Sequence, residues 1–206
     1  MMTSSSTASA VRDLRRVPSA GEPQLARVNG AMTLDVTLLF TDMEGFSEMT
    51  ERLGDHRALD VLRVHNALIR RQVAAHRGFE VEFTGDGFLM AFPIPRHALL
   101  CARSVHEAFA AHNLRHPDES IRVRIGVHSG PVIADRRRFF GKTVICAARI
   151  VRHAKPEEVL VSSFVKQLTE GSGNLAFDGG REVELKGLAG AHRLYRLIPR
   201  LEGEET

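Results

Sequence analysis

The order of apolar segments along the chain constrains its fold more than any other feature. Six segments have the spacing of strand, helix, strand, strand, helix and strand: residues 34–40, 59–76, 79–83, 88–92, 96–113 and 121–128. The third and fourth are joined by Thr84-Gly85-Asp86-Gly87, which is typical of a tight hairpin. This order is that of the split βαβ unit of ferredoxin-like folds, so we predict an α+β domain.

The remaining apolar segments add further strands on the C-terminal side of this unit. After a predicted turn at 129–131 come a shorter strand, a helix at 144–153, and strands at 158–161, 175–177, 182–185 and 192–197. We place one domain at residues 33–198. Residues 1–32 are rich in Ser, Ala, Arg and Pro without an apolar period, which predicts a flexible tail, and residues 199–206 form a short acidic tail.

Composition excludes several classes of protein. Cys101 and Cys146 lie 45 positions apart with no CxxC pair, which excludes a zinc ribbon and a disulfide scaffold and favours the reducing cytoplasm. No apolar run approaches the roughly 18 residues that span a bilayer, so no membrane partner is expected. A net charge of +3, no tryptophan and one tyrosine argue against a nucleic acid partner.

Two acidic residues occupy informative places in the predicted fold. Asp42 directly follows the first strand, and Asp86 lies at the tip of the central hairpin. In a split βαβ sheet these points are neighbours, and two carboxylates without a basic partner repel unless a divalent cation bridges them. Oxygen ligands of this kind favour Mg²⁺ or Mn²⁺ over zinc. Taken alone, Asp42 also fits a helix N-cap and Asp86 an ordinary turn residue.

The segment after Asp42 completes the expected site. Residues 43–46 are predicted to open a helix, whose backbone N–H groups can hold phosphate oxygens. A divalent cation beside such a helix start predicts a triphosphate site. Gly141-Lys142-Thr143 does not belong to a P-loop, because Arg136 stands where the first glycine of that motif is required.

Five segments, in the same order, resemble the motifs of class III nucleotidyl cyclases, the family of adenylyl and guanylyl cyclases. They are LFTDMEGFS at 39–47, TGDGF at 84–88, RVRIGVHSG at 122–130, FGKTV with AARI at 140–150, and LKG at 185–187. The resemblance extends over residues 35–197. It implies a ferredoxin-like βαββαβ domain with C-terminal β additions. It also implies a homodimer that cyclises a nucleoside triphosphate (NTP) at sites on the subunit interface and releases pyrophosphate.

The resemblance also implies a role for individual residues. Asp42, Met43 and Asp86 of one subunit would hold two Mn²⁺ or Mg²⁺ ions. From the other subunit, Arg149 would face the transition state and Lys186 the terminal phosphates; alone, both would be interpreted as surface residues. The implied nucleotide-binding residues are Phe40, Met43, Glu44, Gly45, Phe46, Glu82 and Arg138.

Three positions depart from the adenylyl cyclase pattern. Ile145 replaces the asparagine that holds the ribose, four residues before the transition-state arginine. Glu82 and Arg138 stand where adenylyl cyclases have lysine and aspartate. Glu82 needs an N–H donor, which uracil and guanine offer and the N3 of cytosine lacks, and Arg138 needs acceptors. Because a long Arg138 side chain makes the pocket smaller, we predict UTP in preference to GTP.

A short cyclase with altered base-selecting residues and no fused sensor domain is similar to the pyrimidine cyclases of the bacterial antiphage systems called Pycsar. Those enzymes make cyclic UMP or cyclic CMP, which activates a separate effector protein. We therefore predict a uridylate cyclase with cUMP as its second messenger. A guanylate cyclase making cGMP and a weak or inactive cyclase-like nucleotide binder are the alternatives. A ferredoxin-like nucleic-acid binder is disfavoured, because its strands lack paired aromatic residues.

Overall fold

The computed structural model describes residues 27–28, 31–135, 138–171 and 173–198. Its strands are β1 (Arg27–Val28), β2 (Ala31–Met43), β3 (Phe79–Phe83), β4 (Gly87–Phe92), β5 (Val123–Asp135), β6 (Arg138–Phe140), β7 (Val159–Ser162), β8 (Ala176–Phe177), β9 (Arg181–Glu184) and β10 (Ala191–Ile198). The predicted tails, 1–32 and 199–206, lie outside the described residues apart from 27–28 and 31–32, which are in strands.

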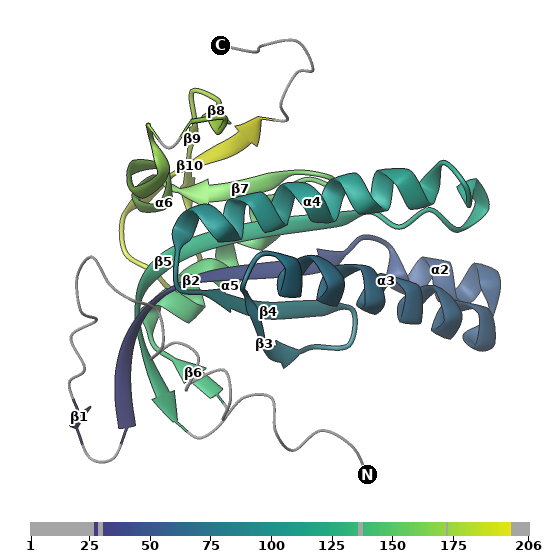
Figure 1. Cartoon of the computed structure of the whole chain (residues 1–206), viewed down its shortest axis with the longest axis horizontal. Helices are drawn as coiled ribbons and strands as arrows, with labels where there is room; N and C mark the ends of the chain where they lie inside the picture. The colour runs from purple at the N-terminus through teal and green to yellow at the C-terminus, as the bar shows by residue number, and fades with distance from the viewer. Residues whose placement is uncertain (1–26, 29–30, 136–137, 172, 199–206) are drawn as a thin grey trace.

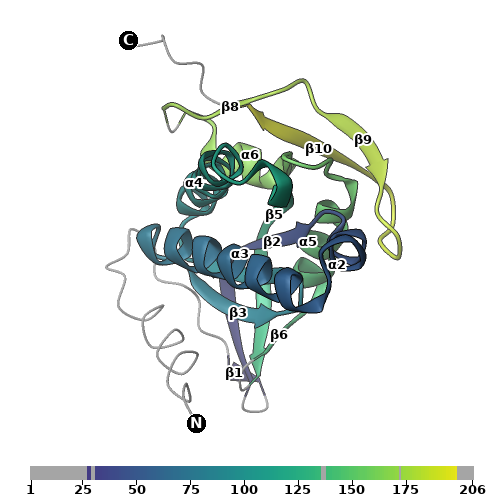
Figure 2. The same cartoon turned by 90° about the vertical axis from the view of Figure 1, so that its right-hand side faces the viewer.

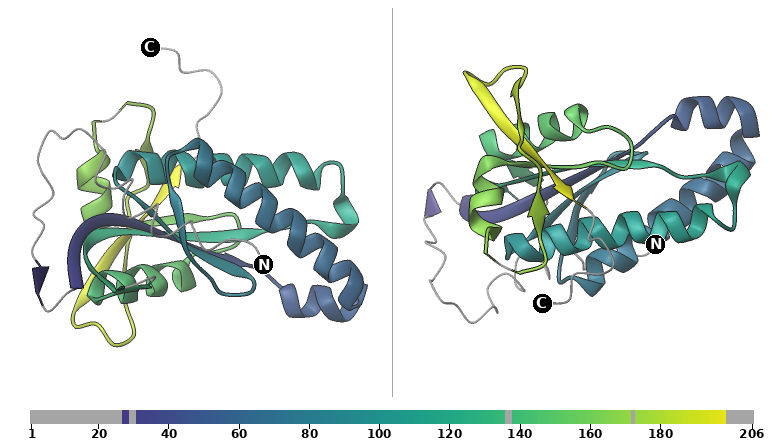
Figure 3. Two further views of the ribbon diagram at one scale, coloured as in Figure 1. Left: turned by 60° about the horizontal axis from the view of Figure 1, so that its bottom comes forward. Right: turned by 90° about the horizontal axis from the view of Figure 1, so that it is seen from above.

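The strands form one mixed sheet whose order begins β3-β4-β2-β5. Within this group of four, adjacent strands are antiparallel. In chain order these are the second, third, first and fourth strands of the predicted βαββαβ unit, so the ferredoxin-like prediction is confirmed (Figure 1). Strands β7, β10 and β8 extend the sheet beyond β5, as the predicted C-terminal additions. Figure 3 shows β9 and β10 as a two-stranded ribbon that extends beyond the body of the sheet.

The helices cover both faces of the sheet. Their bounds are α2 (Phe46–Leu53), α3 (Asp55–Ala75), α4 (Pro95–Asn113), α5 (Lys142–His153) and α6 (Ser163–Thr169), with a 3₁₀ turn at Pro117–Glu119. Helices α3 and α4 lie side by side over one face (Figure 2), and α5 packs on the other. Among the described helices none is long and apolar enough to cross a membrane.

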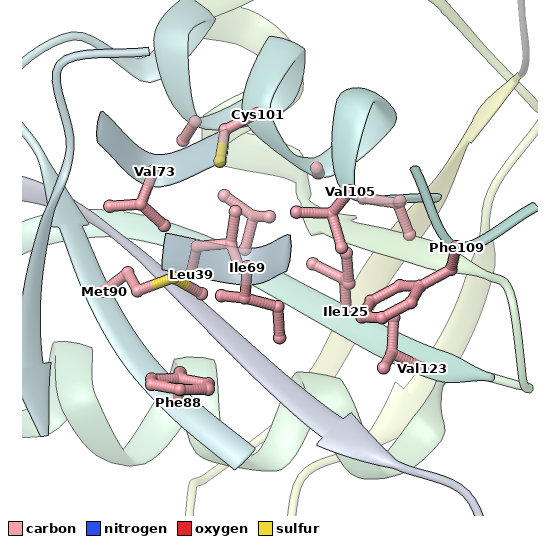
Figure 4. Close-up of a cluster of buried hydrophobic side chains, with 14 of the residues drawn as sticks. Leu39, Ile69, Val73, Phe88, Met90, Cys101, Val105, Phe109, Val123 and Ile125 are labelled. Carbon is pink, nitrogen blue, oxygen red and sulfur yellow. The ribbon is translucent and has the colours of Figure 1, made fainter. Parts of the chain in front are cut away.

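The main core lies between the sheet and the α3–α4 layer. Leu39 of β2, Phe88 and Met90 of β4, and Ile69 of α3 are buried in it, and Val105 of α4 packs against them (Figure 4). On the opposite face α5 lies so close to β5 that a Cβ atom at Gly126 would be only 2.3 Å from the Val151 nitrogen. Glycine at this position therefore allows α5 to pack on the sheet.

The predicted turn at 129–131 is wrong, because β5 continues through it to Asp135. Pro131 pairs with Asp35, and its carbonyl oxygen accepts a hydrogen bond from Thr143 Oγ1 at 2.7 Å. In an antiparallel strand the backbone nitrogen and carbonyl oxygen of one residue point to the same side. The Pro131 carbonyl oxygen points to the start of α5, so its nitrogen does too. The N–H that proline lacks is therefore not one that would bond to β2. Helix α6 was not predicted from the sequence.

Candidate active site

The end of β2 and the tip of the β3–β4 hairpin lie side by side, as predicted. Asp42 pairs with Gly87, and the Met43 amide donates to the Asp86 carbonyl oxygen at 3.1 Å. A side chain at Gly87 would meet the Thr41 carbonyl oxygen at 2.3 Å, so only glycine allows this approach. The structure thus brings Asp42 and Asp86, the two predicted metal ligands, to adjacent backbone positions.

The geometry also tests the alternative interpretations of these two residues. Helix α2 has Gly45 as its N-cap, in a left-handed conformation with φ of 64°, so Asp42 does not cap it. Asp86 does lie in a tight turn, which the Thr84 amide closes on the Gly87 carbonyl oxygen at 2.9 Å. The turn places Asp86 at the apex of the hairpin, where its carboxylate is only partly buried.

Asp42 has a basic partner, contrary to the expectation of two unpaired carboxylates. Its Oδ2 accepts a hydrogen bond from Arg124 Nε at 2.6 Å, and Arg124 Nη2 forms an ion pair with the same oxygen at 2.6 Å. Next along the strands, Arg122 Nη2 lies 2.8 Å from Glu44 Oε2. Arg124 is opposite Asp42 on β5, and Arg122 directly precedes that strand. The two ion pairs neutralise acidic charge where a triphosphate would otherwise be repelled.

The predicted phosphate-binding amides are partly occupied. The Met43 N–H donates to Asp86, and the Glu44 N–H donates to the Arg122 carbonyl oxygen at 2.9 Å. These bonds exist because the strand ladder continues to residue 43 and the helix begins only at Phe46. The expectation that the Met43 and Glu44 amides bind phosphate is therefore corrected, whereas phosphate binding by the Gly45 and Phe46 amides stays a prediction.

The donors at this point fit a hard divalent cation. They are the carboxylates of Asp42 and Asp86 and the carbonyl oxygen of Met43, the residue that follows Asp42 and whose amide bonds to the Asp86 backbone. Arg124 occupies one carboxylate oxygen of Asp42 and leaves the other for an ion. Among the described residues no group of three or more His, Cys, Asp or Glu side chains could hold a metal. The substrate phosphates would have to supply the remaining oxygen ligands.

Arg149 and Lys186 lie together, although 37 positions separate them. Arg149 Nε donates to the Lys186 carbonyl oxygen at 3.1 Å. Lys186 lies in the turn between β9 and β10, which the Leu188 amide closes on the Leu185 carbonyl oxygen at 2.9 Å. Ile145 lies one helical turn before Arg149 on α5 with 46% of its surface exposed, and its side chain offers no hydrogen bond to a ribose.

A half-buried ion pair that sequence reasoning missed holds these elements together. Arg181 of β9 binds both carboxylate oxygens of Glu158 at 3.0 Å and the His153 carbonyl oxygen, at the end of α5, at 2.9 Å. Burial alone would raise the pKa of Glu158, but hydrogen bonds from Arg181 and the Lys155 amide lower it below its usual value. Arg181 thus links the helix of Arg149 to the strand that precedes Lys186.

The base-selecting candidates are arranged differently from the expectation. Glu82 is opposite Leu89, which in turn is opposite Phe40, so all three side chains share the sheet face that α5 covers. Phe40 is partly buried against the apolar cluster there. Phe139 packs into the same cluster. Because consecutive side chains of a strand point to opposite faces, the Arg138 side chain points to the other face of β6, where it is exposed. The structure therefore does not place Glu82 and Arg138 on one face.

This fold, with its carboxylate pair and its arginine–lysine pair, defines a nucleotide cyclase domain. The sequence matches the family model of the adenylate and guanylate cyclase catalytic domain over residues 29–199, and the chain belongs to this family. It is similar to retinal guanylyl cyclase 1 of Homo sapiens, with 30% identity over 74% of this chain, and to human guanylate cyclase soluble subunit beta-2, with 29% identity over 82%. The alignments cover only 15% and 29% of those two proteins.

Solved structures of cyclases have the same fold. An adenylate/guanylate cyclase/hydrolase from Silicibacter pomeroyi superposes with a TM-score of 0.75 at 27% identity, over 82% of this chain and 99% of that one. The adenylyl cyclase CyaB from P. aeruginosa gives a TM-score of 0.76 at 16% identity, over 85% and 99% of the two chains.

Proposed function

We propose that two copies of this chain form a homodimeric nucleotidyl cyclase, which converts an NTP into its 3′,5′-cyclic monophosphate and pyrophosphate. The observation that carries this proposal is the adjacency of Asp42 and Asp86 at the end of β2. Two carboxylates beside a partly exposed hairpin tip suit the capture of a metal-bound triphosphate. Arg149 and Lys186, joined on the α5 side of the sheet, supply the positive charge that the reaction requires.

The reaction is an in-line displacement. The ribose 3′-oxygen forms a bond to the α-phosphorus and loses its proton, while the bond from the α-phosphorus to the pyrophosphate oxygen breaks. Two divalent ions held by Asp42, Asp86 and the Met43 carbonyl would lower the pKa of the 3′-hydroxyl and neutralise the triphosphate. Arg149 of the second subunit would stabilise charge on the α-phosphate oxygens by about 3 kcal/mol, and Lys186 would bind the terminal phosphates.

Glu82 would select the base. A carboxylate accepts hydrogen bonds, so it suits a base with an N–H on its pairing edge, which uracil and guanine have. The narrower proposal is UTP, with cUMP as a messenger in antiphage defence that activates a separate effector. It rests on the similarity to Pycsar cyclases, because the exposed position of Arg138 does not support the expected small pocket.

GTP is the second candidate, and the position of Arg138 favours it. With Arg138 on the opposite face of β6, its side chain does not narrow the space beside Glu82. The curated relatives named above are guanylyl cyclases, which also agrees with a guanine-binding pocket.

The test incubates the full chain with Mn²⁺ and each of the four NTPs and separates the products by mass. We expect one cyclic product to dominate, cUMP or cGMP, and the Glu82→Ala variant to lose that preference. The Arg138→Ala variant separates the two candidates, because it changes the preference only if Arg138 lines the pocket. Absence of any cyclic nucleotide would refute the enzymatic proposal and leave the inactive nucleotide binder, which Ile145 in place of asparagine would explain.

A further inference from the structure

Strand β3 contains one residue more than its partner strand at a single point. Glu80 is opposite Met90 and Glu82 is opposite Leu89, so Val81 has no partner of its own and the ladder shifts there. Such a β-bulge places two consecutive residues against one, and it changes the face to which the following side chains point.

The bulge determines the face on which Glu82 lies. Residues directly opposite each other in an antiparallel pair share a face, so Glu82 shares the face of Leu89. Val81 packs against the apolar cluster on that same face. With regular alternation Val81 would be opposite Leu89, and Glu82 would lie on the α3 side beside Glu80. The extra residue thus directs Glu82 away from α3.

Arg70 of α3 contacts the residues on both sides of the bulge. Its Nε and Nη2 donate to the two carboxylate oxygens of Glu80 at 2.7 and 3.2 Å. Its guanidinium carbon also lies 5.8 Å from the centre of the Phe83 ring and 5.0 Å from that of Phe88. A flat, forked cation suits this combination of a two-point ion pair and ring stacking, which a lysine would not reproduce.

Arg70 lies on a stack of aromatic rings. The Phe83 and Phe88 rings lie 4.9 Å apart, and Phe88 stacks at 5.9 Å on His65, which is fully buried on the same helix. His65 stacks in turn on Phe109 of α4 at 5.6 Å. Arg70 therefore joins a buried aromatic stack to the exposed strand that carries Glu82.

We propose that Arg70 is a positioning residue for base selection. By binding Glu80 and stacking on Phe83, it stabilises the bulge at Val81 and so keeps Glu82 on the substrate face. This inference rests on the proposed function, since Glu82 selects a base only in a site that binds an NTP. Arg70 itself lies on the α3 side of the sheet and touches no substrate.

The experiment compares Arg70→Met, Glu80→Gln and the double variant with Arg71→Met, the neighbouring exposed arginine on the same helix. The value of kcat/KM is measured for all four NTPs. We expect the ratio of the preferred NTP to ATP to fall at least tenfold in each single variant. The double variant should lose no more than Arg70→Met alone, because Arg70→Met already removes the ion pair that Glu80→Gln removes. Arg71→Met should keep the wild-type ratio.

An equal loss for all four NTPs would overturn the inference, because a purely structural role lowers every rate and leaves the ratio unchanged. Binding of 3′-deoxynucleoside triphosphates, which lack the attacking hydroxyl, measures base preference without turnover. If the wild type makes no cyclic product, the catalytic proposal fails, and these binding ratios still test Arg70. A wild type that binds all four equally, or variants that keep its preference, would refute the positioning role.

Discussion

At the scale of single residues, the end of β2 combines Asp42, the carboxylate proposed to bind a metal ion, with an arginine that already binds it. Asp42 and Arg124 are both about one-third exposed, and an ion pair of that exposure contributes only ~0–1 kcal/mol to stability. The pair therefore affects the charge of the site more than it affects the stability of the fold.

We expect Asp42→Asn and Asp86→Asn each to reduce cyclic nucleotide formation by at least ~100-fold, because each removes an anionic ligand. The melting temperature should change by only a few degrees, since both residues are partly exposed. Product is measured by mass and unfolding by calorimetry, with the exposed Asp60→Asn as control. Substantial turnover in either variant would contradict the metal assignment.

The sequence predicted these two carboxylates but not their arginine. Asp42 and Asp86 follow from the split βαβ order alone, because that order places the first strand beside the hairpin. Arg124 is 82 positions from Asp42, and their contact depends on the register between β2 and β5. Patterns within a strand do not determine the register between distant strands. The placement of Arg138 was missed for the same reason.

At the scale of elements, the Glu158–Arg181 pair fixes the position of the β9–β10 ribbon against α5. Glu158 is 7% exposed, and Arg181 binds it through two bonds while also binding the end of α5. Removing one partner of a buried pair leaves the other charge without compensation. The pair therefore contributes both to stability and to the placement of Lys186.

We expect Arg181→Met to lower the free energy of unfolding by about 1–2 kcal/mol at pH 7, since the 39% exposure of Arg181 lets water screen the pair. Because the folded pKa of Glu158 lies below its unfolded value, this contribution is present above the unfolded pKa of about 4.3 and is lost as pH falls through the folded pKa. Urea unfolding at pH 7 and pH 3 tests this, with the exposed Arg193→Met as control. A difference that persists unchanged at pH 3 would contradict it.

Elements with a strong local pattern were predicted, and those that depend on tertiary contacts were not. Helix α4 and the β3–β4 hairpin match their expected positions within two residues, because an apolar stripe and a glycine turn identify them. The continuation of β5 through Pro131 was missed. A proline lacks the N–H of a ladder bond, and this is tolerated here because that side of Pro131 faces the start of α5, a tertiary contact with no local signal. The bulge at Val81 likewise has no local sequence signal.

At the scale of the whole molecule, buried histidines on three elements make stability depend on pH. Burial lowers the pKa of His65, His106 and His128 to about 4 in each case. The unfolded chain, with pKa values near 6.5, binds these protons first, so stability falls as pH decreases from about 6.5 to about 4. Each histidine contributes up to ~1.4 kcal/mol per pH unit within that window.

We expect His65→Leu to reduce the slope of unfolding free energy against pH between pH 6 and pH 4.5 by somewhat less than one-third. The three histidines with pKa values of about 4 dominate the proton uptake, and His97 and His112, whose pKa values burial also lowers, add to it. The exposed His56→Gln on the same helix should leave the slope unchanged. Denaturant titrations across this range provide the measurement. A slope equal to that of the wild type would show that His65 takes up no proton when the protein unfolds in this pH range.

The central claim is that each active site combines Asp42 and Asp86 of one subunit with Arg149 and Lys186 of another. Its most direct test mixes the Asp42→Ala and Arg149→Ala variants and measures cyclic nucleotide formation with Mn²⁺ and the preferred NTP. We predict that each variant alone is inactive. The mixture should recover about a quarter of the wild-type activity, because half of randomly formed dimers hold one intact site of two. A mixture that stays inactive while dimers exchange subunits, or full activity in either variant alone, would contradict the account.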